Sequence, residues 1–213
     1  MLIGHYCASF IAKAVNPKIP LWILLLAAQF VDVIWAVLIM LGVEHGHLDE
    51  TLPSNPLVLS HMPYSHGLVA TLVWAILAYV LAHQLLKASK KASFAIAATV
   101  ASHWFLDLLV HRQDLAIISG EPKFGFGLWN YPALAIAFEV VLFAACAWYF
   151  ISSRQVSIAP PKRRWLIFCV ALVALQFASV FGPHPASFTA MAASGLVIYV
   201  LVAFAGYWIE KKS

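Results

Sequence analysis

The sequence predicts an all-α fold, a polytopic membrane helix bundle. Two observations lead to this class. Hydrophobic residues make up 63% of the chain and charged residues only 10%, a composition typical of membrane proteins. Apolar segments of about 20 residues, the length that crosses a bilayer as a helix, recur along the 213 residues. These spans and their short connections account for nearly all of the residues, so we expect one integral membrane domain over residues 1–213 and no soluble domain.

The spacing of the apolar segments predicts about six transmembrane helices. A short amphipathic or re-entrant helix over residues 2–15 precedes them, and the Asn16-Pro17 break follows it. No basic residue comes before the first apolar residues, so we expect this segment to be mature structure and not a cleaved signal peptide. The expected spans are 19–43, 65–86, 92–111, 128–151, 165–181 and 188–209.

Basic residues gather at alternate ends of the expected helices. By the positive-inside rule these ends are cytoplasmic, and both termini are then cytoplasmic as well. The net charge of +4 therefore indicates membrane orientation, and we expect no nucleic-acid partner. The basic residues concerned are Lys13, Lys18, Lys87, Lys90, Lys91, Arg154, Lys162, Arg163, Arg164, Lys211 and Lys212.

The three cysteines predict neither a disulfide framework nor a thiolate metal site. Cys7, Cys146 and Cys169 lie in apolar surroundings, and none belongs to a Cys-x-x-Cys pair. We expect them to be small buried hydrophobic residues.

A polar stripe interrupts the apolar segment 92–111. His103, Asp107 and His111 are four residues apart, so on a helix they lie on one face. With a rise of 1.5 Å per residue, His103 lies roughly 18 Å and Asp107 roughly 24 Å beyond Lys91. Asp32 lies roughly 21 Å beyond Lys18. These residues are expected in one layer, near or just beyond the midplane.

Other ligand-type residues approach the same layer. Glu139 reaches roughly 15 Å inward from the opposite side, and His5 reaches roughly 12 Å inward if the first helix is re-entrant. His61 and His66 flank the turn Met62-Pro63-Tyr64-Ser65. Imidazoles and carboxylates together suit zinc, iron or manganese. So large a set indicates either two metals or one metal with an acid–base group.

The order of these motifs resembles the YdjM-like family of membrane-bound metal-dependent hydrolases. That family has Thr-His-Leu near its start, then Pro-Asp-x-Asp, His-Arg-Gly-x-Thr-His-Ser and Ser-His-x-x-Leu-Asp. The first half of this chain is similar in His5, in Asp32, in the pair His61 and His66, and in Ser102-His103-x-x-x-Asp107. It departs from the pattern in Gly4 for Thr, in the single acid of 31–34, and in Met62-Pro63 for Arg-Gly. The His-x-x-x-Asp element is also loosely similar to the ligand helix of zinc-dependent phospholipase C enzymes.

The resemblance implies a hydrolase of a bacterial inner membrane that acts on a lipid or lipid-linked ester or phosphoester. One or two divalent ions, zinc before iron or manganese, would activate a water molecule. The metal-site half would be 1–115, with supporting helices over 128–209 and an opening toward the non-cytoplasmic side. The implied metal ligands are His5, Asp32, His61, His66, His103 and Asp107. The implied catalytic residues are Asp107, Asp114, Glu139 and His111, the last three as proton carriers.

Simpler interpretations of the same residues stay open. His103 and Asp107 could be a hydrogen-bonded pair that joins helices. The cluster could also serve an ion- or proton-coupled transporter, although no inverted repeat is visible. A non-catalytic scaffold is a third class. We interpret His45 and His47 as residues of a solvated loop and Asn130 as a helix cap. The oligomeric state is not predicted.

Overall fold

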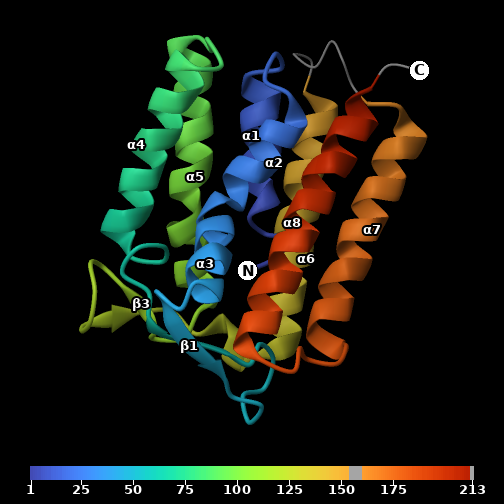
Figure 1. The fold of residues 1–213 in the computed structure, drawn as a ribbon. Coiled ribbons are helices and arrows are strands. Elements are labelled where there is room, and N and C mark those ends of the chain that lie inside the picture. The colour runs from blue at the N-terminus through green and yellow to red at the C-terminus, as the bar shows by residue number, and fades with distance from the viewer. Residues whose placement is uncertain (154–159, 212–213) are drawn as a thin grey trace.

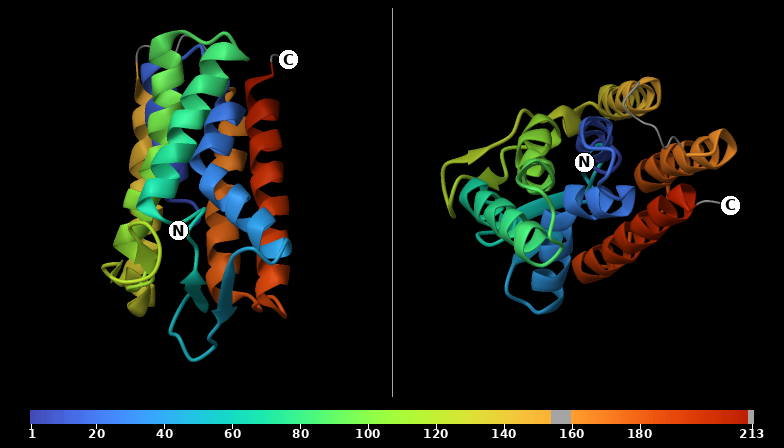
Figure 2. Two further views of the ribbon diagram at one scale, coloured as in Figure 1. Left: turned by 60° about the vertical axis from the view of Figure 1, so that its left-hand side comes forward. Right: turned by 90° about the horizontal axis from the view of Figure 1, so that it is seen from above.

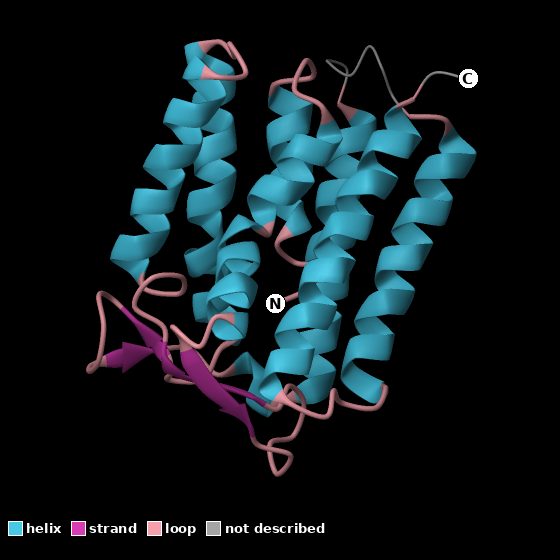
Figure 3. Cartoon of the chain, in the orientation of Figure 1, coloured by secondary structure: helices cyan, strands magenta, loops and turns pink. Residues whose placement is uncertain are grey.

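The computed structural model describes residues 1–153 and 160–211 and shows a helix bundle with two small β-hairpins at one end (Figures 1 and 3). Arg154 and Lys212, expected at a cytoplasmic end, lie outside the described residues. The helices are α1 Tyr6–Val15, α2 Leu21–Ala28, α3 Phe30–Met40, α4 Leu68–Gln84, α5 Lys90–Val110, α6 Pro132–Ser152, α7 Lys162–Phe181 and α8 Phe188–Glu210, with the 3₁₀ turn η1 Leu128–Asn130. The strands are β1 His45–Leu48, β2 Leu57–His61, β3 Leu115–Ala116 and β4 Lys123–Phe124.

Within the described ranges, the helices long and apolar enough to cross a membrane are four: α5, α6, α7 and α8. The bent pair α2 and α3 makes a fifth if it is counted as one span. Helix α1 has 10 residues and α4 has 17, fewer than the about 20 that a crossing typically uses. The chain is therefore an integral membrane protein by helix length and composition, with four or five such spans where about six were expected.

The span expected over 19–43 is broken at Gln29, where the axes of α2 and α3 differ by 54°. Neither proline nor glycine causes this bend. The buried Gln29 side chain turns aside and donates from Nε2 to the carbonyl of Leu2, at 3.0 Å. A side chain that enters the hydrogen-bond ladder of a helix is a recognised cause of a sharp kink, and at this break His103 Nδ1 bonds the carbonyl of Ala28, at 2.9 Å. Membranes tolerate such breaks where other groups satisfy the backbone.

The two ends of the bundle differ in chemistry. We call the end opposite the hairpins the basic end, because α1 finishes there and α5 and α7 begin there with lysines (Figure 1). At this end the buried Lys13 pairs with Glu210, with Nζ and Oε1 2.5 Å apart. Lys13 Nζ also donates to the carbonyls of Pro17 and Ile19. We call the other end the hairpin end.

Helix α1 lies inside the bundle and runs from its middle to the basic end (Figures 1 and 2). Its Phe10 is fully buried against Phe143, Phe150 and Trp165, with ring centroids 5.2 to 6.1 Å apart. These contacts join α1 to α6 and α7. The expected short N-terminal helix is therefore present, and it carries His5 to the centre of the protein.

The hairpin end contains strands where loops were expected. β1 pairs with β2 in antiparallel register, with His45 opposite His61, and β3 pairs with β4. The loops between these strands and the helices bring His66 and His111 to the bundle interior, because each lies at the start or end of a helix.

Candidate metal centre

The polar stripe of α5 faces the interior of the protein. His103 and Asp107 lie one turn apart and His111 is the C-cap, and all three are at most 2% exposed. Asp107 is three residues from the last residue of α5. The stripe therefore occupies the half of α5 that is nearer the hairpin end.

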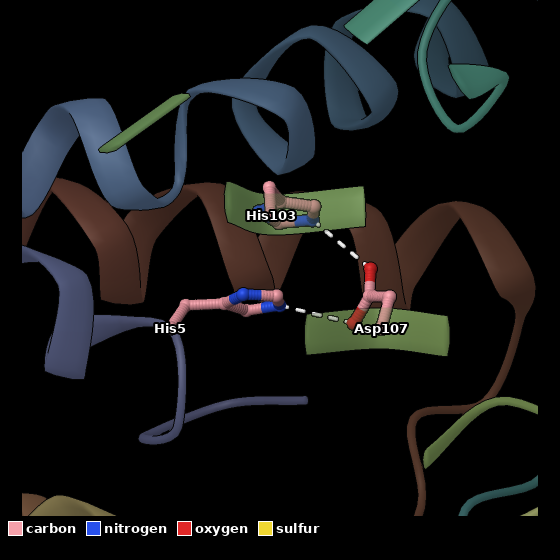
Figure 4. A group of neighbouring side chains, drawn as sticks. All are labelled: His5, His103 and Asp107. Carbon is pink, nitrogen blue, oxygen red and sulfur yellow. Dashed lines mark ion pairs between the residues drawn. The ribbon is translucent and has the colours of Figure 1, made fainter. Parts of the chain in front are cut away.

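Asp107 is the centre of the cluster, with one carboxylate oxygen toward each of two pairs of histidines. Its Oδ1 lies 3.0 Å from His5 Nε2 and 3.7 Å from His111 Nε2. Its Oδ2 lies 3.1 Å from His103 Nε2 and 3.8 Å from His66 Nε2. Figure 4 shows His5 and His103 one above the other, each paired with a different oxygen of this carboxylate. The amine of Met1 also lies 2.6 Å from Oδ1.

Asp32 supplies a second carboxylate from the first turn of α3. Its Oδ1 lies 3.3 Å from His66 Nε2 and 3.6 Å from His103 Nε2. Two groups of ligand atoms therefore meet within metal-binding range: His5, His103 and Asp107, and Asp32, His66 and His103. The rings of His5 and His103 are stacked, with centroids 3.8 Å apart and planes 6° from parallel.

Three of the histidines have their other ring nitrogen held by an oxygen atom. His103 Nδ1 lies 2.9 Å from the carbonyl of Ala28, at the break between α2 and α3. A carbonyl only accepts, so Nδ1 carries the proton and Nε2 presents its lone pair to the carboxylates. His111 Nδ1 is held in the same way by Asp114 Oδ1, at 2.9 Å.

The third histidine is oriented through a serine. Glu44, which is buried, accepts from the Ser65 hydroxyl at 2.5 Å and from the backbone N–H groups of Tyr64 and Ser65. Since the Ser65 proton goes to Glu44, its oxygen accepts from His66 Nδ1, at 2.9 Å. The Nε2 lone pair of His66 therefore also points into the cluster.

This donor set fits a divalent metal. Among the described residues, the buried Nε2 of His103 has no hydrogen-bond partner, although it lies beside two carboxylates. Burying such an atom without a partner costs free energy, which a metal ion would offset. Outer oxygen atoms that hold the second ring nitrogen are the usual surroundings of metal-binding histidines. Imidazole and carboxylate ligands together suit zinc, iron or manganese.

A cavity of about 380 Å³ adjoins the cluster. Asp32, His66, Asp107, His111 and Glu139 line its inner end, and helices α6, α7 and α8 form its walls. Glu139 Oε2 accepts from the N–H groups of Leu2 and Gly4, at 3.0 and 3.4 Å. Glu139 thus faces the same space as the metal-binding groups.

The structure brings together most of the residues expected from the sequence: His5, Asp32, His66, His103, Asp107 and His111. It does not bring His61 to them, because His61 is exposed at the end of β2. Asp114 is beside the cluster, but its oxygens bind His111 Nδ1 and the N–H of Leu59. It therefore orients His111, where a proton carrier was expected. His111 in turn presents a ligand atom.

A glycine loop fixes His111 at the end of α5. Gly127 N–H donates to the His111 carbonyl at 2.7 Å, and Phe126 N–H donates to the Leu108 carbonyl at 2.8 Å. A Cβ atom at Gly125, where φ is 158°, would collide with the carbonyls of His111 and Arg112. Only glycine permits this approach of the loop to the helix end.

Two residues that orient His66, Glu44 and Ser65, were not predicted from the sequence. In the sequence, Glu44 directly precedes the segment of His45 and His47 that we interpret as a solvated loop, and Ser65 belongs to the turn between His61 and His66. Tyr199 is a third residue of interest, because it lines the cavity from α8. It lies in the apolar run 196–205 with no motif around it. The sequence contains no signal that would have identified Tyr199.

No protein-family model matches the chain, and no curated protein or solved structure matches it. The proposed function therefore rests on the geometry of the cluster.

Proposed function

We propose that this protein is a membrane-embedded, metal-dependent hydrolase of a lipid or lipid-linked ester or phosphoester. One observation supports the proposal most. Four imidazole nitrogens and two carboxylates converge in a buried cluster, beside a cavity with room for a substrate.

His5, Asp32, His66, His103 and Asp107 would hold one or two ions of zinc, iron or manganese, with His111 as a further ligand. Asp107 would contribute to holding them with both oxygens, since Oδ1 lies beside His5 and His111 and Oδ2 beside His103 and His66. A bound divalent metal supplies Lewis acidity, which activates water and polarises the bond to be cleaved.

Glu139 is the residue we assign to proton transfer. Its Oε2 is fixed by two backbone N–H groups, and no described residue forms a hydrogen bond with Oε1. A carboxylate held at one oxygen and open at the other can take a proton from water and return it to a leaving group. It lines the same cavity as Asp32, His66, Asp107 and His111.

We place the basic end in the cytoplasm of a bacterial inner membrane, with both chain ends on that side, because lysine and arginine favour the cytoplasmic face. The cavity would then open toward the non-cytoplasmic side, near the level of lipid headgroups. Membership in the YdjM-like family agrees with this proposal and stays a prediction.

The first test is the metal content of protein purified without chelators, measured by mass spectrometry of the elements. Wild type should hold stoichiometric metal, and His103→Ala and Asp107→Ala should lose it. His61→Ala is the matched control and should keep the wild-type content, because His61 is exposed and outside the cluster. A wild-type protein without metal would contradict the proposal.

A second test separates hydrolysis from ion transport. Metal-loaded protein is incubated with lipid phosphates and lipid esters, and products are measured by mass spectrometry. The same preparation is placed in liposomes and assayed for ion and proton flux. Product formation that Asp107→Ala abolishes supports the hydrolase. Flux without product would favour the transporter.

A further inference from the structure

The two halves of α7 differ in how they pack. Its first half contributes Trp165, Phe168 and Leu172 to the main hydrophobic core, together with α1 and α6. Past Leu172, the buried residue of α7 is Gln176. The second half of the helix lines the cavity, so it forms the outer wall of a space between α6, α7 and α8.

Three polar side chains of this wall already have hydrogen-bond partners within the protein. Ser179 donates to the Gln176 carbonyl at 2.8 Å and Ser194 to the Met191 carbonyl at 2.9 Å, each within its own helix. Gln176 Oε1 accepts from the N–H of Ile3 at 3.4 Å. Apart from Tyr199, the other α7 and α8 side chains that line the cavity are small or apolar, so most of this wall favours a hydrocarbon ligand.

The inner end of the same cavity has the opposite character. Asp32, Asp107 and Glu139 line it, and the unpartnered His103 Nε2 lies between Asp32 and Asp107. A ligand that satisfies both ends has a polar, oxygen-bearing group joined to a hydrocarbon chain. Small residues, Ala178 and Ser179 on α7 and Ser194 and Gly195 on α8, line the cavity between these two helices.

We propose that this cavity holds a single hydrocarbon chain of an amphiphile whose polar group lies at the cluster, and that the chain enters from the lipid between α7 and α8. The polar half of this inference rests on the proposed function. A volume of about 380 Å³ is near the lower limit of ligand pockets, roughly 300 to 1,000 Å³, which favours one chain over two.

The test uses a monoalkyl phosphate with a diazirine at the end of its chain. The probe is incubated with the full-length protein, the protein is exchanged into fresh detergent to remove loosely held probe, and the sample is irradiated. We expect one adduct per chain, mapped to peptides that contain Ile136, Leu175 or Ile198, all of which line the cavity. A dialkyl phosphate of the same chain length should label less.

Two tryptophan variants on α8 give the matched comparison. Ile198→Trp places an indole in the cavity and should lower labelling by about tenfold, because the chain loses its space. Val197→Trp makes the same change one residue away, where the side chain is 58% exposed on the outside. It should label as wild type does. Equal labelling of the two variants, or adducts mapped to α4, would contradict the proposal that this cavity binds the hydrocarbon chain.

An alkyl alcohol carrying the same diazirine separates this inference from the proposed function. His103→Ala, which should lack metal, is expected to keep labelling with this neutral probe and to lose labelling with the phosphate. If wild type proves metal-free and the alcohol still labels at Ile198, the chain site stands and the hydrolase fails. Metal and hydrolysis could instead both be present while Ile198→Trp and Val197→Trp are labelled equally by both probes. In that case the proposed hydrocarbon site alone is wrong.

Discussion

Histidines gather in two regions of this protein, with opposite surroundings. His66, in the buried cluster, lies beside Ser65, whose hydroxyl donates to Glu44. His47, on the β1–β2 hairpin, also lies beside a serine, with Nδ1 3.4 Å from Ser60 Oγ. That pair is exposed, like His45 and His61 on the same two strands. The same residue types are thus fixed in one region and solvated in the other.

The difference shows what turns a histidine into a candidate ligand. In the cluster an acceptor holds Nδ1, so the Nε2 lone pair is already aimed at two carboxylates. On the hairpin, water competes for every ring nitrogen, and the side chain loses rotamer freedom if it binds anything. Preorganisation by outer oxygens, more than histidine number, distinguishes the two regions.

The largest expected effect comes from Ser65→Ala. This change removes the oxygen that fixes His66 Nδ1 and leaves Glu44 without one of its donors. We expect metal affinity to fall by about 10- to 100-fold, the usual cost of losing such a partner. Competition with a chromophoric chelator measures the affinity.

Ser60→Ala is the matched control, since it removes the equivalent oxygen from His47. It should leave metal affinity unchanged, and Ser65→Thr, which keeps a hydroxyl, should restore most of the loss. If Ser60→Ala and Ser65→Ala weaken metal binding equally, the contrast between the two regions has no functional meaning.

Much of the helical architecture was predictable because hydrophobic length is a strong signal in membranes. The segments 92–111, 128–151, 165–181 and 188–209 correspond to α5 through α8. The break at Gln29 was not predictable in the same way, because one glutamine in an apolar run leaves the mean hydropathy high. The hairpins were missed since their strands are short and lack a clear alternation of apolar and polar residues.

The site shows the same division. The i, i+4 spacing of His103 and Asp107 fixed their common face before any tertiary contact was known. The prediction that His61 and His66 bind metal together was wrong for His61. Sequence spacing does not reveal that β2 ends at His61, whereas His66 directly precedes the start of α4. Glu44 is distant from Ser65 in sequence, so only the folded loop brings the two together.

The next effect concerns the helix break that orients His103. In Gln29→Leu, the Leu2 carbonyl loses its donor, and we expect unfolding to become easier by about 1 to 3 kcal/mol. Gln84→Leu makes the same change at the exposed end of α4 and should stay within about 0.5 kcal/mol of wild type. Thermal unfolding in detergent compares the two variants. A Gln29→Leu protein as stable as Gln84→Leu would show that the Gln29 side-chain amide does not stabilise the fold.

The smallest effect contrasts two hydroxyl–carboxylate contacts of similar length. Ser65 donates to the buried Glu44 at 2.5 Å, and Thr51 donates to Asp49, at the hairpin end, at 2.6 Å. The Thr51 hydroxyl and N–H lower the pKa of the exposed Asp49 carboxyl. Because the folded pKa is lowered, this contact contributes above the ordinary pKa of aspartate and is lost as pH falls through the lowered value.

Thr51→Ala should therefore raise the pKa of Asp49 toward its ordinary value, and Thr51→Ser should keep it low. An NMR titration of the Asp49 carboxyl carbon follows the change. Metal content should stay at the wild-type level, because water can replace the lost hydroxyl at an exposed carboxylate but cannot reach the one beside His66. A loss of metal in Thr51→Ala would show that Asp49 and the buried cluster are coupled, whereas the hydroxyl and N–H of Thr51 both donate to Asp49 and not to a residue of the cluster.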